Sequence, residues 1–426
     1  MRAEGETGRW PLSRRRFLTG GSALAAGLLT GIRARSARGA SSAIPPVSLG
    51  AQPGGLPARQ HAWGATLSRD HFGNPIAPRF DRLLFFDVVG TPTPAYAQLL
   101  EAALRTLERR YPWGPRGLLF TAGWGPAYFA DVLGVASPVP PATALAPFES
   151  PAIDRYHLCL HLAGNDEQRL AAVEAALIHG AELPGADGPT DISPALRWRE
   201  TRTGFVGTGL PAGHQDVSGI PPGRPVPDSS PLFMGFRSGL RKNQATEDAV
   251  TIATGPFAQG TTMQVSYMRL RLDGWYRKLS YRERVARMYA PEISPRRLKH
   301  LTTDAASDPG QIDQAIRRYG VIGHAQTSAL ARRHGKPLII RRDFNTVDGG
   351  HAGLHFVSVQ RSIDDFIVTR TAMNASGAHL VNRQITGTRN NGINEFIVVL
   401  RRANYILPSR DERSFPLLPG RAGVLG

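Results

Sequence analysis

The residues best suited to chemistry lie between Gly323 and Phe344. His324 precedes a short apolar run, residues 337–340, which predicts a strand that ends in the pair Arg341-Arg342. One imidazole nitrogen can hold the iron of a haem group. One fixed guanidinium above the iron can stabilise the oxyanion that departs when bound peroxide is cleaved, and arginine suits this role because it stays charged. A plainer interpretation also fits: a surface histidine and two strand-end arginines on a basic protein.

Two series of predicted elements must position these residues. The first comprises a strand at 83–89, an amphipathic helix at 94–111, strands at 117–121 and 156–163, a helix at 167–178 and a strand at 197–201. The second comprises a strand at 262–272, a helix at 281–288, strands at 337–340 and 354–361, a helix at 363–373 and a strand at 396–400. Both follow the β-α-β-β-α-β order of the ferredoxin-like fold. The sequence therefore predicts an α+β protein with two ferredoxin-like domains.

Stretches rich in proline and glycine indicate where the linker and the domain boundary lie. Residues 44–60 are rich in proline, glycine and serine and predict a linker. We expect an N-terminal ferredoxin-like domain at 61–225 and a C-terminal one at 226–426, which would carry the haem site. The segment 204–231, rich in glycine and proline, predicts a crossover or a surface loop between them.

The balance of residue types excludes several classes of protein. An apolar content of 41% and a charged content of 20% in 426 residues are typical of a globular protein. The net charge is +17, yet we find no dense stripe of basic residues interleaved with aromatics, so no nucleic-acid partner is expected. Cys159 is the single cysteine, which excludes an internal disulfide.

The N-terminus carries a specific export pattern. The run Ser13-Arg14-Arg15-Arg16-Phe17-Leu18 precedes a mild apolar stretch rich in alanine and glycine at 24–32, and resembles a twin-arginine signal over residues 1–43. The resemblance implies the twin-arginine translocase as a partner and a periplasmic or extracellular location. The apolar stretch is too short for a stable span. Retention as an uncleaved membrane tether and an ordinary basic tail are the alternatives.

Several segments resemble one known family. The stretch Leu119 to Phe129, the distal-loop stretch Leu232 to Asn243 and the strand Leu354 to Arg361 are similar to the dye-decolourising (DyP-type) peroxidases, and the likeness spans roughly residues 55 to 420. It implies haem b, an iron-containing cofactor. It also implies an oxidoreductase that uses hydrogen peroxide to oxidise a bulky reductant through a ferryl intermediate.

The resemblance assigns roles to individual residues. His324 corresponds to the axial ligand of the iron and Arg341 to the distal cation, with Arg342 as the neighbouring alternative. Phe344 and Phe356 are expected beside the cofactor. A carboxylate bonded to the second ring nitrogen of His324 is also expected, although the sequence does not identify it.

The departure from the family pattern falls at Ser238, which stands where the family has a distal aspartate that moves the peroxide proton. Near neutral pH a serine hydroxyl does not take up and release a proton as a carboxylate does, although it can position a water. Asp216, Asp228 and Asp248 are candidate replacements for that aspartate.

Ser238 motivates an alternative function, a haem carrier or sensor of the same fold without efficient turnover. A third interpretation is an exported scaffold with bulky side chains between His324 and Arg341. The reductant and the oligomeric state, a homo-oligomer included, stay open.

Overall fold

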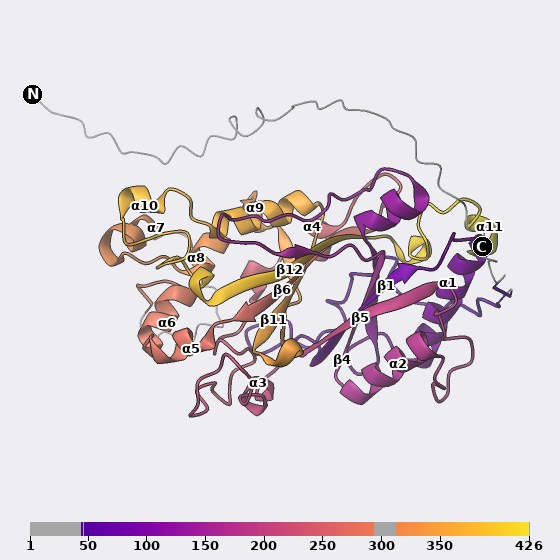
Figure 1. The fold of residues 1–426 in the computed structure, drawn as a ribbon, viewed down its shortest axis with the longest axis horizontal. Coiled ribbons are helices and arrows are strands. Elements are labelled where there is room, and N and C mark those ends of the chain that lie inside the picture. The colour runs from indigo at the N-terminus through magenta and orange to yellow at the C-terminus, as the bar shows by residue number, and fades with distance from the viewer. Residues whose placement is uncertain (1–43, 46, 294–311, 426) are drawn as a thin grey trace, which may run out of the picture. The chain divides into compact units, whose positions relative to one another are not determined.

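One sheet of ten strands organises the chain in the computed structural model, which describes residues 44–45, 47–293 and 312–425 (Figure 1). The strand order is β10-β5-β1-β4-β2-β12-β6-β11-β9, and β3 (Ala152–Ile153) pairs with β12. Two of the central strands, β2 (Leu119–Trp124) and β4 (Leu158–Gly164), are buried along their whole length. Both strands are mostly apolar in sequence, without the alternation of polar and apolar residues that a strand with one solvent-facing side shows, and this explains their burial on both faces.

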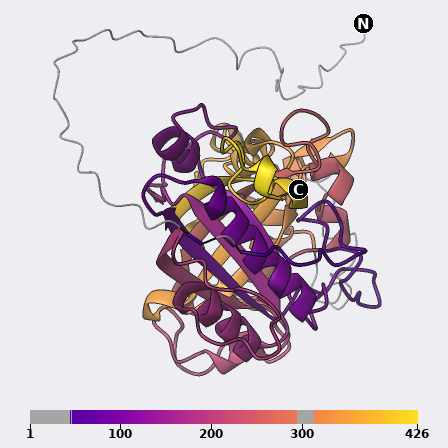
Figure 2. The same ribbon diagram turned by 90° about the vertical axis from the view of Figure 1, so that its right-hand side faces the viewer.

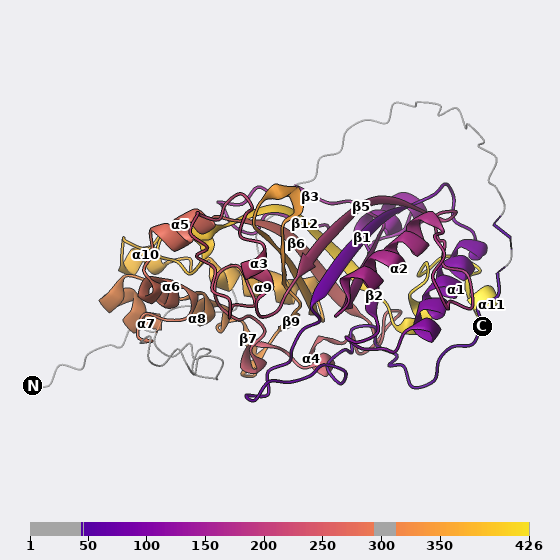
Figure 3. The same ribbon diagram turned by 90° about the horizontal axis from the view of Figure 1, so that it is seen from below.

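The first half of the sheet is one ferredoxin-like unit. Its elements are β1 (Phe80–Val88), α1 (Pro94–Arg110), β2, β4, α2 (Glu167–His179) and β5 (Leu196–Phe205). The strands lie in the order β5-β1-β4-β2 and every neighbouring pair is antiparallel. Helices α1 and α2 lie side by side against this unit, as Figures 1 and 3 show, and Figure 2 views the molecule from their side.

Local sequence explains where these two helices begin and end. Pro94 occupies the first turn of α1, and Arg109 and Arg110 occupy its last turn, where positive charge complements the helix dipole. Asp166 caps α2 by accepting a hydrogen bond from the backbone N–H of Arg169. Gly180 ends α2 with φ of 62°, a left-handed conformation that favours glycine.

The second half repeats the arrangement. Its strands β6 (Thr261–Leu270), β9 (Ile339–Arg341), β11 (Gly353–Gln360) and β12 (Ile397–Leu407) lie in the order β12-β6-β11-β9. Helix α9 (Ile363–Met373) connects β11 to β12. In the described part of the chain, four short α-helices lie between β6 and β9: α5 (Leu272–Arg277), α6 (Tyr281–Met288), α7 (Ile312–Gln314) and α8 (His324–Ser328). The prediction of an α+β fold with two ferredoxin-like units is therefore confirmed.

Strand β10 (Phe344–Thr346) closes the sheet on itself. It pairs with β5 of the first unit through Asn345 and Phe205, and with β11 of the second unit through Phe344 and His355. On the other side, β2 pairs with β12. A cluster of buried apolar side chains from both units packs together, including Leu83, Phe85, Met263, Val265, Val357 and Tyr405. Because one sheet runs through both units, the boundary proposed at residue 225 stays a prediction.

The sequence also predicts an export signal at residues 1–43 and a crossover at 204–231. Residues 1–43, where the sequence predicts the export signal, lie outside the described residues. In the described part of the chain, none of the helices combines the length and the apolar character that crossing a membrane requires. The crossover predicted at 204–231 begins with the last two residues of β5, and beyond Phe205 it is irregular apart from the four-residue helix α3 (Leu210–Gly213).

Candidate active site

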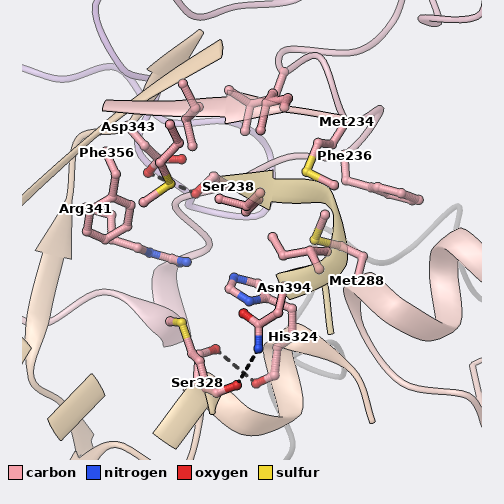
Figure 4. Close-up of a pocket in the computed structure, with 18 of the residues that line it drawn as sticks. Met234, Phe236, Ser238, Met288, His324, Ser328, Arg341, Asp343, Phe356 and Asn394 are labelled. Atoms are coloured by element: carbon pink, nitrogen blue, oxygen red, sulfur yellow. Dashed lines mark hydrogen bonds between the residues drawn. The ribbon is translucent and has the colours of Figure 1, made fainter. Parts of the chain in front are cut away.

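A cavity lies against the sheet of the second unit (Figure 4). Strands β6, β11 and β12 contribute apolar side chains to its wall. Helices α6, α8 and α9, the loop at 232–243 and the segment from β9 to β10 also line it. The apolar lining includes Met234, Phe236, Leu270, Met288, Phe356 and Ile397. A largely apolar wall with a few polar groups is typical of a binding site for an organic ligand.

His324 is the first residue of α8 and lines this cavity. Two glycines hold its backbone closely. A Cβ atom at Gly323 would lie 1.7 Å from the carbonyl oxygen of Tyr289, and a Cβ atom at Gly392 would lie 3.1 Å from the Cα atom of His324. The backbone N–H of Gly323 also donates to Oε1 of Gln326 at 2.9 Å, which ties down the first turn. The position of the imidazole is thus fixed by backbone contacts that only glycine permits.

The imidazole of His324 is neutral. Burial lowers its pKa to about 3, and the positive charges of Arg341 and Arg370 act in the same direction. The neutral ring is the form that binds a metal. Among the described residues, neither ring nitrogen of His324 has a hydrogen-bond partner, so the carboxylate expected behind it is not found in that part of the chain.

Arg341 ends β9 on the opposite side of the cavity, and its guanidinium points toward His324 (Figure 4). Gln244 holds the backbone of Arg341 from both sides: Oε1 accepts from its N–H at 2.8 Å, and Nε2 donates to its carbonyl at 3.0 Å. The Nε atom of Arg341 is buried and has no partner in the described part of the protein. A buried donor without a partner is costly, which indicates that a ligand in the cavity is expected to satisfy it.

Arg342 and Phe344, both expected beside the cofactor, do not line this cavity. The guanidinium of Arg342 lies 3.7 Å from the ring centroid of Trp63 and donates to the carbonyl of His61. Phe344 is fully buried between His161 and His355. The reason is the alternation of side chains along an extended chain, which sends neighbours to opposite faces. Phe356, by contrast, does line the cavity.

Ser238 lies in the loop beside Arg341 and faces a carboxylate that the sequence reasoning missed. Its Oγ donates to Oδ1 of Asp343 at 3.1 Å, and both residues line the cavity (Figure 4). None of the three aspartates considered as replacements, Asp216, Asp228 and Asp248, lines it. The spacing contained the signal: Asp343 is two residues beyond Arg341, and residues two apart on an extended chain share a face.

Asn345 anchors the loop that carries Ser238. Its Oδ1 accepts from the N–H of Phe233 at 2.8 Å, and its Nδ2 donates to the carbonyls of Phe205 and Pro231 at 2.9 and 3.1 Å. Asn345 is fully buried and belongs to β10, the strand that closes the sheet. The closing strand therefore fixes the distance between the loop and Arg341.

Most of the charges around the cavity are paired. Four arginines line it, Arg237, Arg341, Arg370 and Arg402, against two carboxylates, Glu149 and Asp343. Glu149 is held between Arg370 at 2.7 Å and Arg402 at 3.0 Å, and Arg237 pairs with Asp70 at 2.8 Å. The neutral imidazole of His324 and the unsatisfied guanidinium nitrogen of Arg341 are therefore the groups that suit a haem b in this cavity.

A second, more open cavity meets the first at the Arg341 side. The residues that line both include Arg237, Ser238, Arg341 and Asp343. Trp63 and Arg342 lie on the wall of the second cavity alone. The polar groups opposite His324 thus stand at the junction of the two cavities, where a small molecule entering from solvent would meet them first.

Comparison with known proteins defines the family and the fold. The model of a family described as a family of unknown function, DUF7405, matches residues 78–409. The chain belongs to the DUF7405 family. None of the curated proteins compared matches this DUF7405 member.

Solved structures similar to this DUF7405 member include DyP-type peroxidases. The enzyme from Cellulomonas bogoriensis superposes with a TM-score of 0.53 at 19% identity, over 81% of this chain and 95% of that one. A variant of DypB from Rhodococcus jostii RHA1, in complex with heme, gives 0.54 at 15% identity, over 84% and 99%. At these identities the likeness concerns the fold. This DUF7405 member therefore has the fold of DyP-type peroxidases, whereas the correspondence of Ser238 to their distal aspartate stays a prediction.

Proposed function

We propose that this protein is a haem-dependent peroxidase that reduces hydrogen peroxide and oxidises a bulky second substrate. The observation that carries the proposal is the placement of His324 and Arg341 across one largely apolar cavity in a DyP-type fold. When bound, haem supplies the iron centre at which peroxide is reduced and oxidising equivalents are held.

Different residues of the cavity would hold the haem, orient the peroxide and exclude water. A ring nitrogen of His324 would ligate the iron. Arg341 would orient the peroxide and stabilise the negative charge that develops on it. The apolar wall would exclude water, which strengthens each of these electrostatic contacts.

A haemin titration tests this proposal. Purified protein with added haemin should give a Soret band at one equivalent, and His324→Ala should lose or shift that band. His379→Ala is the matched control, because His379 is an exposed histidine that does not line the cavity. A parent protein that gives no Soret band, or a His324→Ala variant with the parent spectrum, would remove the proposal.

Haem binding without peroxide turnover is the second candidate, and Ser238 is the observation that favours it. Rapid mixing of the haem-loaded protein with peroxide separates the two. A fast spectral change that Arg341→Leu slows by about a hundredfold or more supports the enzyme. No spectral change in the parent within seconds supports a carrier or sensor.

We extend the proposal to export by the twin-arginine route, with a periplasmic or extracellular destination. Its support is the motif at residues 13–18 followed by the mild apolar stretch at 24–32. Replacing Arg14, Arg15 and Arg16 by lysine should retain the full-length chain in the cytoplasm of a host with this pathway. Fractionation and mass spectrometry of the N-terminus would measure it, and equal export of the two forms would contradict it.

A further inference from the structure

Asp343 is the carboxylate of the cavity that keeps an oxygen available. Its Oδ1 accepts from Ser238 Oγ at 3.1 Å, and no residue of the described ranges pairs with its Oδ2. Glu149, the other carboxylate of the lining, has both oxygens engaged by Arg370 and Arg402. A group that accepts a proton from a ligand needs a free lone pair within the cavity. Only Asp343 meets that requirement among these two.

The surroundings of Asp343 place it beside the proposed peroxide position. It shares a face with Arg341, and both line the two cavities where these meet. The charged groups that line the second cavity with it are five arginines and two carboxylates: Arg69, Arg237, Arg241, Arg341, Arg342, Asp81 and Glu247. Five cations stand against two further carboxylates, and this excess of positive charge favours an anion formed from the peroxide here.

We propose that Asp343, positioned by Ser238, is the group that accepts the proton of hydrogen peroxide in this protein. The inference rests on the proposed function and assigns its missing proton acceptor. The O–H bond of the peroxide breaks, its proton passes to Oδ2 of Asp343, and its electron pair stays on oxygen. The product is a hydroperoxide anion whose charge faces Arg341. Ser238 acts as a positioning residue, since its hydroxyl holds Oδ1 and thereby turns Oδ2 toward the cavity.

Cyanide binding tests the proton transfer without turnover. Hydrogen cyanide must lose a proton before it binds ferric haem as an anion, whereas imidazole binds as a neutral molecule. For haem-loaded Asp343→Asn we expect cyanide association to slow by about a hundredfold or more, with imidazole association within about twofold of the parent. Asp343→Glu should recover part of the cyanide rate. Ser238→Ala should slow it by about tenfold or less, because the carboxylate itself remains.

Controls separate this inference from the proposed function and from a purely structural role. Asp228→Asn removes an exposed aspartate outside the cavity and should bind cyanide like the parent. Urea denaturation of the haem-free variants checks that each one folds. A haem-loaded Asp343→Asn that binds cyanide at the parent rate would overturn the inference and leave the proposed function standing. A parent that takes up no haem would overturn both.

Discussion

Replacing Gly323 by alanine is expected to disconnect His324 from the cavity, because the new methyl group has no space. A Cβ atom there would lie 1.7 Å from the carbonyl oxygen of Tyr289. Carbon and oxygen atoms approach to about 3.3 Å at closest, so about 1.6 Å of separation is missing. The obstacle is backbone, not the end of a flexible side chain, so either the start of α8 or the segment at Tyr289 must move. His324, the next residue, moves with it.

The expected loss of stability and the expected loss of haem binding follow from the cost of overpacking and from the small displacement that a ligand group tolerates. Overpacking of a well-ordered site costs about 1–3 kcal/mol, occasionally more, which gives the expected loss in free energy of unfolding of the haem-free protein. Ligand groups must stay within about 0.5 Å of their productive positions, and the required shift is about three times larger. We therefore expect the Gly323→Ala variant to fold, to unfold at lower urea concentration, and to bind haemin without the parent Soret band.

Urea denaturation followed by haemin titration measures both effects. Gly213→Ala is the matched control, because a Cβ atom at Gly213 meets nothing within 4 Å. It should leave both the stability and the Soret band unchanged. A Gly323→Ala variant with parental stability and parental spectrum would show that the close contact at Tyr289 does not hold His324 in place, and the reasoning would be refuted.

Three further predictions use other contacts of the site. Arg342→Leu should lower the free energy of unfolding by about 1–3 kcal/mol in urea denaturation, because Arg342 packs on Trp63 and donates a hydrogen bond to the carbonyl of His61. The haem spectrum should stay unchanged, because Arg342 lies outside the cavity of His324. A changed Soret band would contradict this. Asn345→Ala removes three side-chain hydrogen bonds to backbone groups, although the carbonyl of Pro231 keeps the N–H of Gly207 as a partner. It should cost about 2 kcal/mol or more by the same measurement. A loss below about 1 kcal/mol would contradict it. Burial raises the pKa of Glu149, but Arg370 and Arg402 lower it by more, so the net shift is downward. The stability this provides is present above the unfolded pKa, about 4.3, and is lost as pH falls through the folded pKa. Glu149→Gln should therefore be less stable at pH 7 and flatter below pH 4 in urea midpoints, and parallel pH curves for the two proteins would disprove it.

The sequence predicted the regular elements well, because their patterns are local. The spacing of leucines between Pro94 and Arg110 predicted α1, and the apolar run at β4 predicted a buried strand. The paired strand orders then followed from the β-α-β-β-α-β sequence of elements. The contribution of His324 and Arg341 to one cavity also agrees with the structure, although their chemical roles stay predictions.

Long-range pairings could not be predicted in the same way. Strand β10 has only three residues, too few for a period, and its two partners lie in different halves of the chain. The bond between Ser238 and Asp343 joins residues 105 positions apart. Arg342 and Phe344 were assigned to the cofactor by resemblance, and neither lines the cavity that His324 and Arg341 share, so their role stays a prediction. The alternation of side chains, applied to the residues after Arg341, would have pointed to Asp343 as a carboxylate of that cavity.

The closure of the sheet by β10 makes the protein's two halves inseparable as folding units. If the chain were cut between β5 and β6 and the fragments were produced apart, each would present bare strand edges with unbonded N–H and C=O groups. Such edges recruit other chains, so the fragments would be expected to aggregate or to recombine with one another. Any export route that requires a finished structure would then have to wait until the last strand, β12, has been synthesised and joined to β2.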